Sequence, residues 1–116
     1  MTNFQPGKPE RRKSIRYSNA GKMFCYVKLE EAKTVGPIEI HDLSAQGIRL
    51  VVDPLIQLPM AGTVQLYARE SRTWLAIPFQ VVYLLPEPKT GLFLAGCNFN
   101  RELRETELKS LLPQKQ

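Results

Sequence analysis

IEIHDL, at residues 38–43, alternates apolar and polar side chains with the two-residue period of a half-buried β-strand. The stretch MFCYVKL, at residues 23–29, is rich in residues that favour strands. Residues 30–37 lie between the two and include a Gly-Pro pair, which suits a hairpin connection. We therefore predict that the two stretches form an antiparallel pair. The alternation predicts that Asp42 lies on the same side of its strand as Ile40.

The rest of the chain extends this pattern. Four further strand candidates follow at regular spacing, at residues 48–52, 63–68, 73–85 and 92–99. Turn-forming residues separate them, and short strands of this kind are typical of an antiparallel barrel or sandwich. Residues 101–112 differ, because they carry leucines at helical spacing after Asn100, a residue that can cap a helix. The sequence predicts an all-β domain with one C-terminal α-helix over residues 101–112.

Length and composition limit the organisation of the protein. A chain of 116 residues is the size of one domain. Residues 1–10 combine proline, glycine and polar side chains and predict a flexible arm, which leaves residues 11–112 for the folded domain. No apolar run is long enough for a membrane helix, and the N-terminal stretch lacks the apolar segment of a signal peptide. We expect a cytoplasmic protein without membrane insertion.

The residue types give little support to catalysis. His41 is the only histidine, and Cys25 and Cys97 lie within apolar strand-like stretches rather than at metal-ligand spacing. We interpret both cysteines as core residues. The chain carries no nucleophile paired with a base and no glycine-rich phosphate loop. We therefore expect no enzyme activity, no metal and no cofactor.

The charge of the chain is concentrated near its start. The formal net charge is +5. Six basic residues crowd the first 22 positions against a single acid, Glu10: Lys8, Arg11, Arg12, Lys13, Arg16 and Lys22. This distribution predicts an anionic partner that meets the N-terminal segment.

Two short segments are chemically complementary. Residues 11–16, RRKSIR, supply guanidinium groups that match phosphate oxygens, and residues 42–47, DLSAQG, supply acceptors and a tight turn. The arginine segment leads into the first strand of the predicted pair, and the second segment leaves the other strand. Because antiparallel neighbours place these two ends together, we expect the segments to meet at one end of the sheet.

These motifs, R-R-x-x-x-R followed by D-x-S-x-x-G, resemble those of a PilZ domain, and the resemblance covers about residues 10–112. It implies a six-stranded antiparallel Greek-key-type barrel followed by a helix, and a bacterial receptor for the second messenger cyclic di-GMP. It also carries ligand-binding roles to five positions, namely Arg12, Arg16, Asp42, Ser44 and Gly47. No motif position is substituted.

Each position has a chemical reason to contact this ligand. Arg12 and Arg16 can donate to phosphate oxygens and to guanine O6 or N7, and they can stack on the bases. Asp42 can accept from guanine N1–H and N2–H, which adenine lacks. Ser44 can bond phosphate or base, and Gly47 permits a sharp turn or a close approach.

Three further residues extend the predicted site. An arginine at the position of Arg11 resembles family members that bind a mutually intercalated pair of nucleotides, so the ligand is one nucleotide or such a pair. Lys13 is a weaker candidate. Tyr83 either lies against a guanine or is an aromatic residue of the barrel. We interpret Arg49, Arg69 and Arg72 as exposed strand charges and Trp74 as a core or surface residue of its strand.

The leading function is a receptor whose N-terminal arginine segment changes conformation on cyclic di-GMP binding and signals to an unidentified downstream protein. Motility, adhesion and exopolysaccharide control are all open. One alternative is a nucleotide-independent protein-interaction module. A second, less favoured alternative is a nucleic-acid binder that uses the basic arm.

Overall fold

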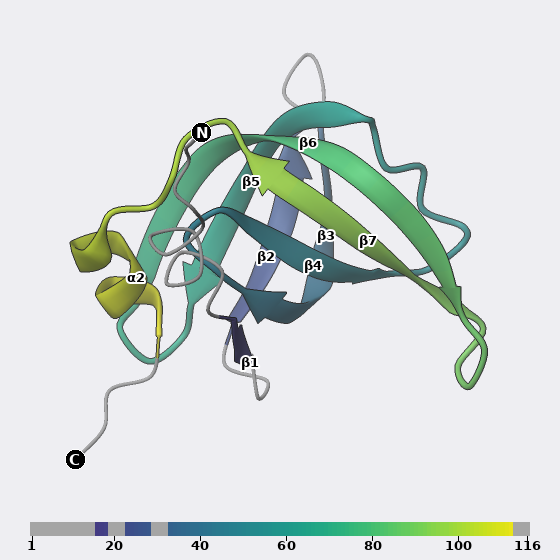
Figure 1. The fold of residues 1–116 in the computed structure, drawn as a ribbon, viewed down its shortest axis with the longest axis horizontal. Coiled ribbons are helices and arrows are strands. Elements are labelled where there is room, and N and C mark those ends of the chain that lie inside the picture. Colours follow the sequence, from purple (N-terminus) through teal and green to yellow (C-terminus); the bar gives the residue numbers. More distant parts are fainter. Residues whose placement is uncertain (1–15, 19–22, 29–32, 113–116) are drawn as a thin grey trace, which may run out of the picture.

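The computed structural model describes residues 16–18, 23–28 and 33–112. These residues form strands and one helix, which Figure 1 labels in chain order. The elements are β1 (Tyr17–Ser18), β2 (Met23–Lys28), β3 (Thr34–Leu43), β4 (Gly47–Val52), β5 (Ala61–Ala68), β6 (Thr73–Glu87), β7 (Leu92–Phe99) and α2 (Glu105–Leu111). No helix in the described part of the chain is long and apolar enough to cross a membrane.

Six of the strands close into an antiparallel barrel. The sheet order is β1-β3-β2-β5-β6-β7-β4, and the pairing of β3 with β4 closes the ring. The predicted first pair is confirmed, because Phe24 of β2 lies opposite Glu39 of β3. The short β1 adds a seventh strand beside the end of β3, where Ser18 lies opposite Asp42. The predicted six-stranded barrel with a C-terminal helix is thus confirmed, with one extra short strand (Figure 1).

Alternate side chains of every barrel strand fill the core. The fully buried large side chains come from β2 to β6 and from α2: Val27, Ile38, Ile40, Leu43, Ile48, Leu50, Val64, Leu66, Ile77, Phe79 and Leu111. Both cysteines lie in this core, and burial raises the pKa of the Cys25 and Cys97 thiols to about 12. The thiols are therefore protonated at neutral pH and pack as small apolar groups, as predicted.

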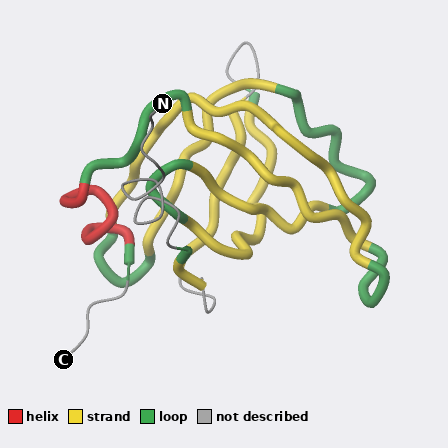
Figure 2. Tube along the Cα trace, in the orientation of Figure 1, coloured by secondary structure: helices red, strands yellow, loops and turns green. Residues whose placement is uncertain are grey.

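Two boundaries differ from the sequence prediction by a full four residues, and the other strands begin or end within two residues of it. The strand β3 begins at Thr34, so Gly36 and Pro37 belong to the strand rather than to the connection before it. The helix begins at Glu105 instead of residue 101, and Asn100 does not cap it. Figure 2 shows residues 100–104 as a loop that leads from the end of β7 to the helix.

The helix begins at Glu105 because the Glu107 carboxylate accepts hydrogen bonds from Arg101 and Arg104, which precede the helix. The Arg104 backbone N–H donates to Glu107 Oε1 at 2.7 Å, and the Arg101 guanidinium donates to both carboxylate oxygens at 2.9 Å. Hydrogen bonds from Arg101 and from the Arg104 backbone lower the pKa of Glu107 to about 2. This cap fixes the start of the helix one turn later than the leucine pattern indicates.

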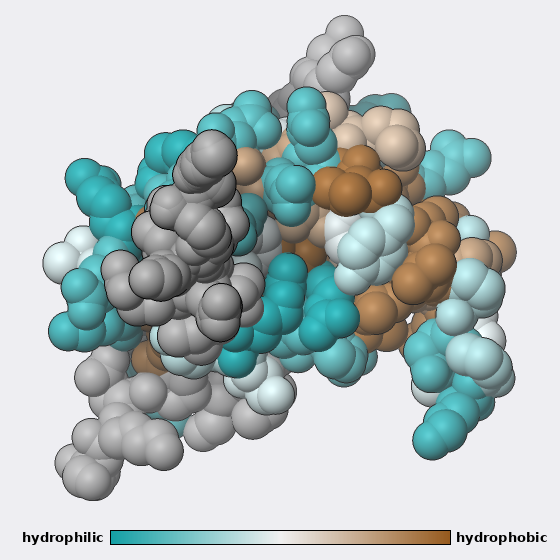
Figure 3. Space-filling view, in the orientation of Figure 1, coloured by the Kyte–Doolittle hydropathy of each residue, from teal (hydrophilic) through white to brown (hydrophobic). Residues whose placement is uncertain are grey.

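The C-terminal half of β6 extends beyond the end of its neighbour β5. Residues 73–80 of β6 pair with β5, whereas the pairing with β7 covers residues 79–81 and continues over residues 83–87. Four consecutive apolar or aromatic residues, at positions 82–85, are exposed there. Figure 3 shows apolar atoms gathered on the right of the view over β6 and β7, beside hydrophilic atoms over the centre.

Candidate functional site

A bulge in β3 turns Asp42 to the outside of the barrel. Ile40 lies opposite Leu50 of β4, but Asp42 lies opposite Arg49, so the single residue His41 has no partner of its own in this register. Directly opposed residues share a face of the sheet, and Arg49 lies on the outer face of β4. The prediction that Asp42 shares the side of Ile40 is therefore wrong. The extra residue reverses the alternation just before the motif.

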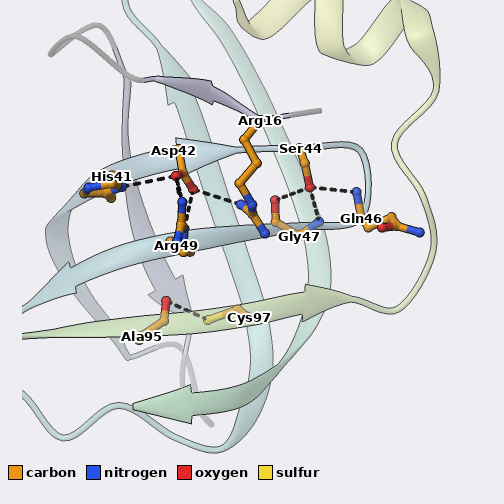
Figure 4. Close-up of polar contacts among 9 residues, drawn as sticks. All are labelled: Arg16, His41, Asp42, Ser44, Gln46, Gly47, Arg49, Ala95 and Cys97. Atoms are coloured by element: carbon orange, nitrogen blue, oxygen red, sulfur yellow. Dashed lines mark hydrogen bonds and ion pairs between the residues drawn. The ribbon is translucent and has the colours of Figure 1, made fainter. Parts of the chain in front are cut away.

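The Asp42 carboxylate is nevertheless almost covered, because two guanidinium groups and an imidazole surround it. Only 6% of its side chain is exposed. Arg16 donates from Nη1 to Asp42 Oδ1 at 2.8 Å, and His41 Nδ1 lies 3.2 Å from Oδ2. Arg49 donates from Nε to both oxygens at 3.0 Å and also forms a short contact from Nη2 to Oδ2. Figure 4 shows these groups converging on the carboxylate from β3, β4 and the residue before β1.

These contacts keep Asp42 ionised. Burial raises the pKa of the carboxyl, but hydrogen bonds from Arg49 and His41 and the charges of Arg16 and Arg49 outweigh it. The net result is an Asp42 pKa below its ordinary value. Near neutral pH the site therefore presents a carboxylate, which can only accept hydrogen bonds.

Ser44 holds the turn that follows Asp42. The Ser44 side chain is buried, and its Oγ accepts hydrogen bonds from the backbone N–H groups of Gln46 and Gly47, both at 3.2 Å. The Ser44 backbone N–H donates to the Gly47 carbonyl at 2.8 Å. Figure 4 shows this hydroxyl inside the turn. In the described structure Ser44 shapes the turn, and its contact with a phosphate or base stays a prediction.

Gly47 is explained by a close approach between strands. It lies opposite Asn98 of β7, and a Cβ atom at this position would overlap the Cys97 carbonyl oxygen, far inside the 3.0 Å that real Cβ atoms respect. Any other residue would push β4 away from β7 next to the turn. In the described structure the glycine permits a close approach to the neighbouring strand, and the predicted close approach to the ligand stays a prediction.

Arg49 is the residue that sequence reasoning missed. The sequence indicates an exposed strand charge, but Arg49 is half-buried, with 30% of its side chain exposed, and it forms the bidentate contact with Asp42. The signal was available, since a tight hairpin that pairs Leu43 with Ile48 also pairs residue 42 with residue 49.

Tyr83 lies in the same cross-strand row. Arg49 and Tyr83 both lie opposite Gly96 of β7, and a Cβ on Gly96 would overlap the Tyr83 ring. The ring therefore covers Gly96 beside Arg49. The row runs across four strands of the barrel, from Asp42 to Tyr83.

The structure brings together five of the eight predicted site residues. Arg16, Asp42, Ser44 and Gly47 gather at one end of the β3–β4 pair, and Tyr83 joins through the row just described. Arg11, Arg12 and Lys13, and the predicted arm of residues 1–10, lie outside the described residues.

A polar pocket adjoins the turn. Its volume is about 330 Å³, and its lining consists of Gln46, Asn98, Phe99, Asn100, Arg101 and Glu102. Residues 99–103 are fastened to the turn by two backbone hydrogen bonds of 2.8 Å, one from Phe99 to Gln46 and one from Leu103 to Ala45. The turn is therefore rigidly supported on the side away from Asp42. The amide and guanidinium groups that line the pocket offer further polar contacts beside the motif.

Several solved structures resemble this fold. The PilZ domain of YcgR from Escherichia coli with c-di-GMP is 19% identical, with a TM-score of 0.54 over 87% of this chain and 86% of that one. An uncharacterized Legionella protein, Lpg0364, is 18% identical, with a TM-score of 0.56 over 84% and 85% of the two chains. The Bacillus subtilis inhibitor of motility MotI/DgrA is 14% identical, with a TM-score of 0.62 over 84% of this chain and 46% of that protein.

Comparison by sequence places the whole barrel in one family. No curated protein sequence matches the chain. The sequence model of the PilZ domain, by contrast, matches residues 10–113, which include both motifs, every barrel strand and the helix. The chain belongs to the PilZ domain family.

Proposed function

We propose that this protein is a receptor for cyclic di-GMP, which binds on the outer face of the barrel where Arg16 meets the β3–β4 turn. The observation that carries the proposal is the Arg16–Asp42 ion pair beside the turn held by Ser44, within a PilZ domain. The solved PilZ domain of YcgR with c-di-GMP supports the choice of ligand.

The ligand and the site are chemically matched. Cyclic di-GMP carries two phosphodiester charges and two guanines, and the site combines guanidinium groups with an ionised carboxylate. Arg16 would donate to a phosphate or to guanine O6 and N7, and Asp42 would accept from guanine N1–H and N2–H. Arg12 and Arg11, a few residues earlier, would add cations, and the latter makes a pair of intercalated nucleotides the favoured ligand.

Binding would change the partner of Arg16. In the described structure this guanidinium is engaged by Asp42, and 35% of its side chain is exposed. An anionic ligand would draw it away from the carboxylate, and the residues before β1 would reorder over the barrel surface. We propose that a downstream protein recognises the altered surface. Motility is one pathway to examine, because a similar structure is an inhibitor of motility.

Calorimetric titration with cyclic di-GMP tests this proposal. We expect saturable binding near two nucleotides per chain, and cyclic di-AMP should bind at least about tenfold more weakly, because a matched base contact is worth about 1–3 kcal/mol. A single-stranded oligonucleotide serves as the control competitor and should not displace the ligand. Equal affinity for both dinucleotides would contradict the role of Asp42. Displacement by the oligonucleotide with a steep salt dependence would instead support the nucleic-acid alternative.

A further inference from the structure

The two arginines hold Asp42 in different ways. Arg16 contacts one carboxylate oxygen through one nitrogen, and it precedes a strand of only two residues. Arg49 spans both oxygens with Nε and Nη2, and it lies in the middle of β4, which pairs with β3 on one side and β7 on the other. A planar guanidinium in this bidentate arrangement fixes the orientation of a carboxylate, which a single hydrogen bond does not.

Arg49 has an aromatic ring beside it on the opposite side. The Tyr83 ring lies over Gly96 of β7, the residue that lies opposite Arg49. A side chain at residue 96 would occupy the place of the ring. Asp42, Arg49 and Tyr83 thus form a fixed row on the barrel wall, and Arg16 reaches this row from outside the barrel.

We propose that Arg49 is a positioning residue of the ligand site: it holds the Asp42 carboxylate toward the guanine edge and remains its counter-charge when Arg16 turns to the ligand. This inference rests on the proposed function, because it concerns the same site. Without Arg49, release of Arg16 would leave a nearly buried carboxylate with only the His41 imidazole beside it among the described side chains that contact it. With Arg49 in place, Arg16 can exchange partners without that penalty.

The test compares Arg49→Gln and Arg49→Lys with the wild-type protein. Arg72→Gln is the matched control, because it removes the same charge from the exposed β5–β6 turn. Each variant is titrated with cyclic di-GMP and cyclic di-AMP, and the Asp42 carboxyl is followed by NMR against pH in the free protein. Among the described residues, the Arg16 and Arg49 guanidinium groups and the His41 imidazole surround this carboxyl.

We expect Arg49→Gln to weaken cyclic di-GMP binding about tenfold or more, the loss that corresponds to one charge-assisted hydrogen bond. The preference for guanine over adenine should fall as well, and the Asp42 pKa should rise toward its ordinary value. Arg49→Lys keeps the charge but loses the planar, bidentate guanidinium. Compared with Arg49→Gln, it should therefore regain part of the affinity but not the guanine preference. Arg72→Gln should behave as the wild type.

The proposal is overturned if folded Arg49→Gln keeps both the affinity and the guanine preference of the wild type, or if Asp42 titrates unchanged in it. If Arg49→Gln does not fold, the guanine preference of Arg49→Lys decides, and a wild-type preference overturns the proposal. If the wild-type protein does not bind cyclic di-GMP, the proposed function fails. The titration of Asp42 in the free variants still shows in that case whether Arg49 holds the carboxylate.

Discussion

Replacing Arg16 by alanine is expected to abolish the binding of cyclic di-GMP while the barrel stays folded. The side chain leaves from the residue before β1, contacts Asp42 through one hydrogen bond and contributes nothing to the apolar core. In the complex it would donate to phosphate or guanine, and two such charge-assisted bonds are worth about 3–6 kcal/mol. Their loss corresponds to at least about a hundredfold weaker binding, measured by calorimetry.

The same result is expected for Arg12→Ala, whose role comes from the family motif. Arg104→Ala is the matched control, since this arginine is 76% exposed at the start of α2 and lies in neither motif. It should bind as the wild type does. Tight binding retained by Arg16→Ala, in a protein whose circular dichroism is unchanged, would refute the proposed site.

Gly47→Ala is expected to destabilise the barrel strongly. The new methyl group would overlap the Cys97 carbonyl oxygen, which belongs to the backbone of β7 and cannot swing aside as a side chain could. Separating β4 from β7 at this point would also loosen the turn held by Ser44. We expect a loss of about 3 kcal/mol or more in the free energy of unfolding, the upper range for overpacking in a tight site.

Urea unfolding measures this loss, and Gly62→Ala is the matched control. Gly62 also lies in a barrel strand, but a Cβ there would meet the Lys28 carbonyl oxygen at 3.4 Å, an ordinary contact. That variant should lie within about 1 kcal/mol of the wild type. If Gly47→Ala unfolds at the wild-type urea concentration and loses only ligand binding, the glycine serves the ligand and not the strand contact.

The barrel could be predicted from the sequence because its strands follow simple alternation. Ile38 and Ile40 point into the core as the period of two requires, and the antiparallel pair with residues 23–28 follows from strand propensity and a short connection. The prediction failed where the backbone leaves that regularity. The bulge at His41 has no marker in the side-chain pattern, and it reverses the face of Asp42.

The site was only partly predictable for a related reason. Asp42, Ser44 and Gly47 carry a motif, whereas Arg49 does not, and its role appears only when the register of β3 and β4 is known. The late start of the helix has the same origin, because Glu107 acts through a cap with Arg101 and Arg104 that leucine spacing does not show. Local sequence patterns predict where strands and helices lie. Contacts between side chains on different strands can be predicted only once the register of those strands is known.

The central claim is that cyclic di-GMP binds on the Arg16–Asp42 face, and NMR titration with this nucleotide tests it most directly. We expect the largest shifts at the Arg16 side-chain N–H and at the backbone amides of residues 44–47, where the ion pair and the turn meet. Phe24 and Tyr67 pack together on the outer face of β2 and β5 and should shift little. An unchanged spectrum, or shifts confined to that aromatic face, would contradict the account.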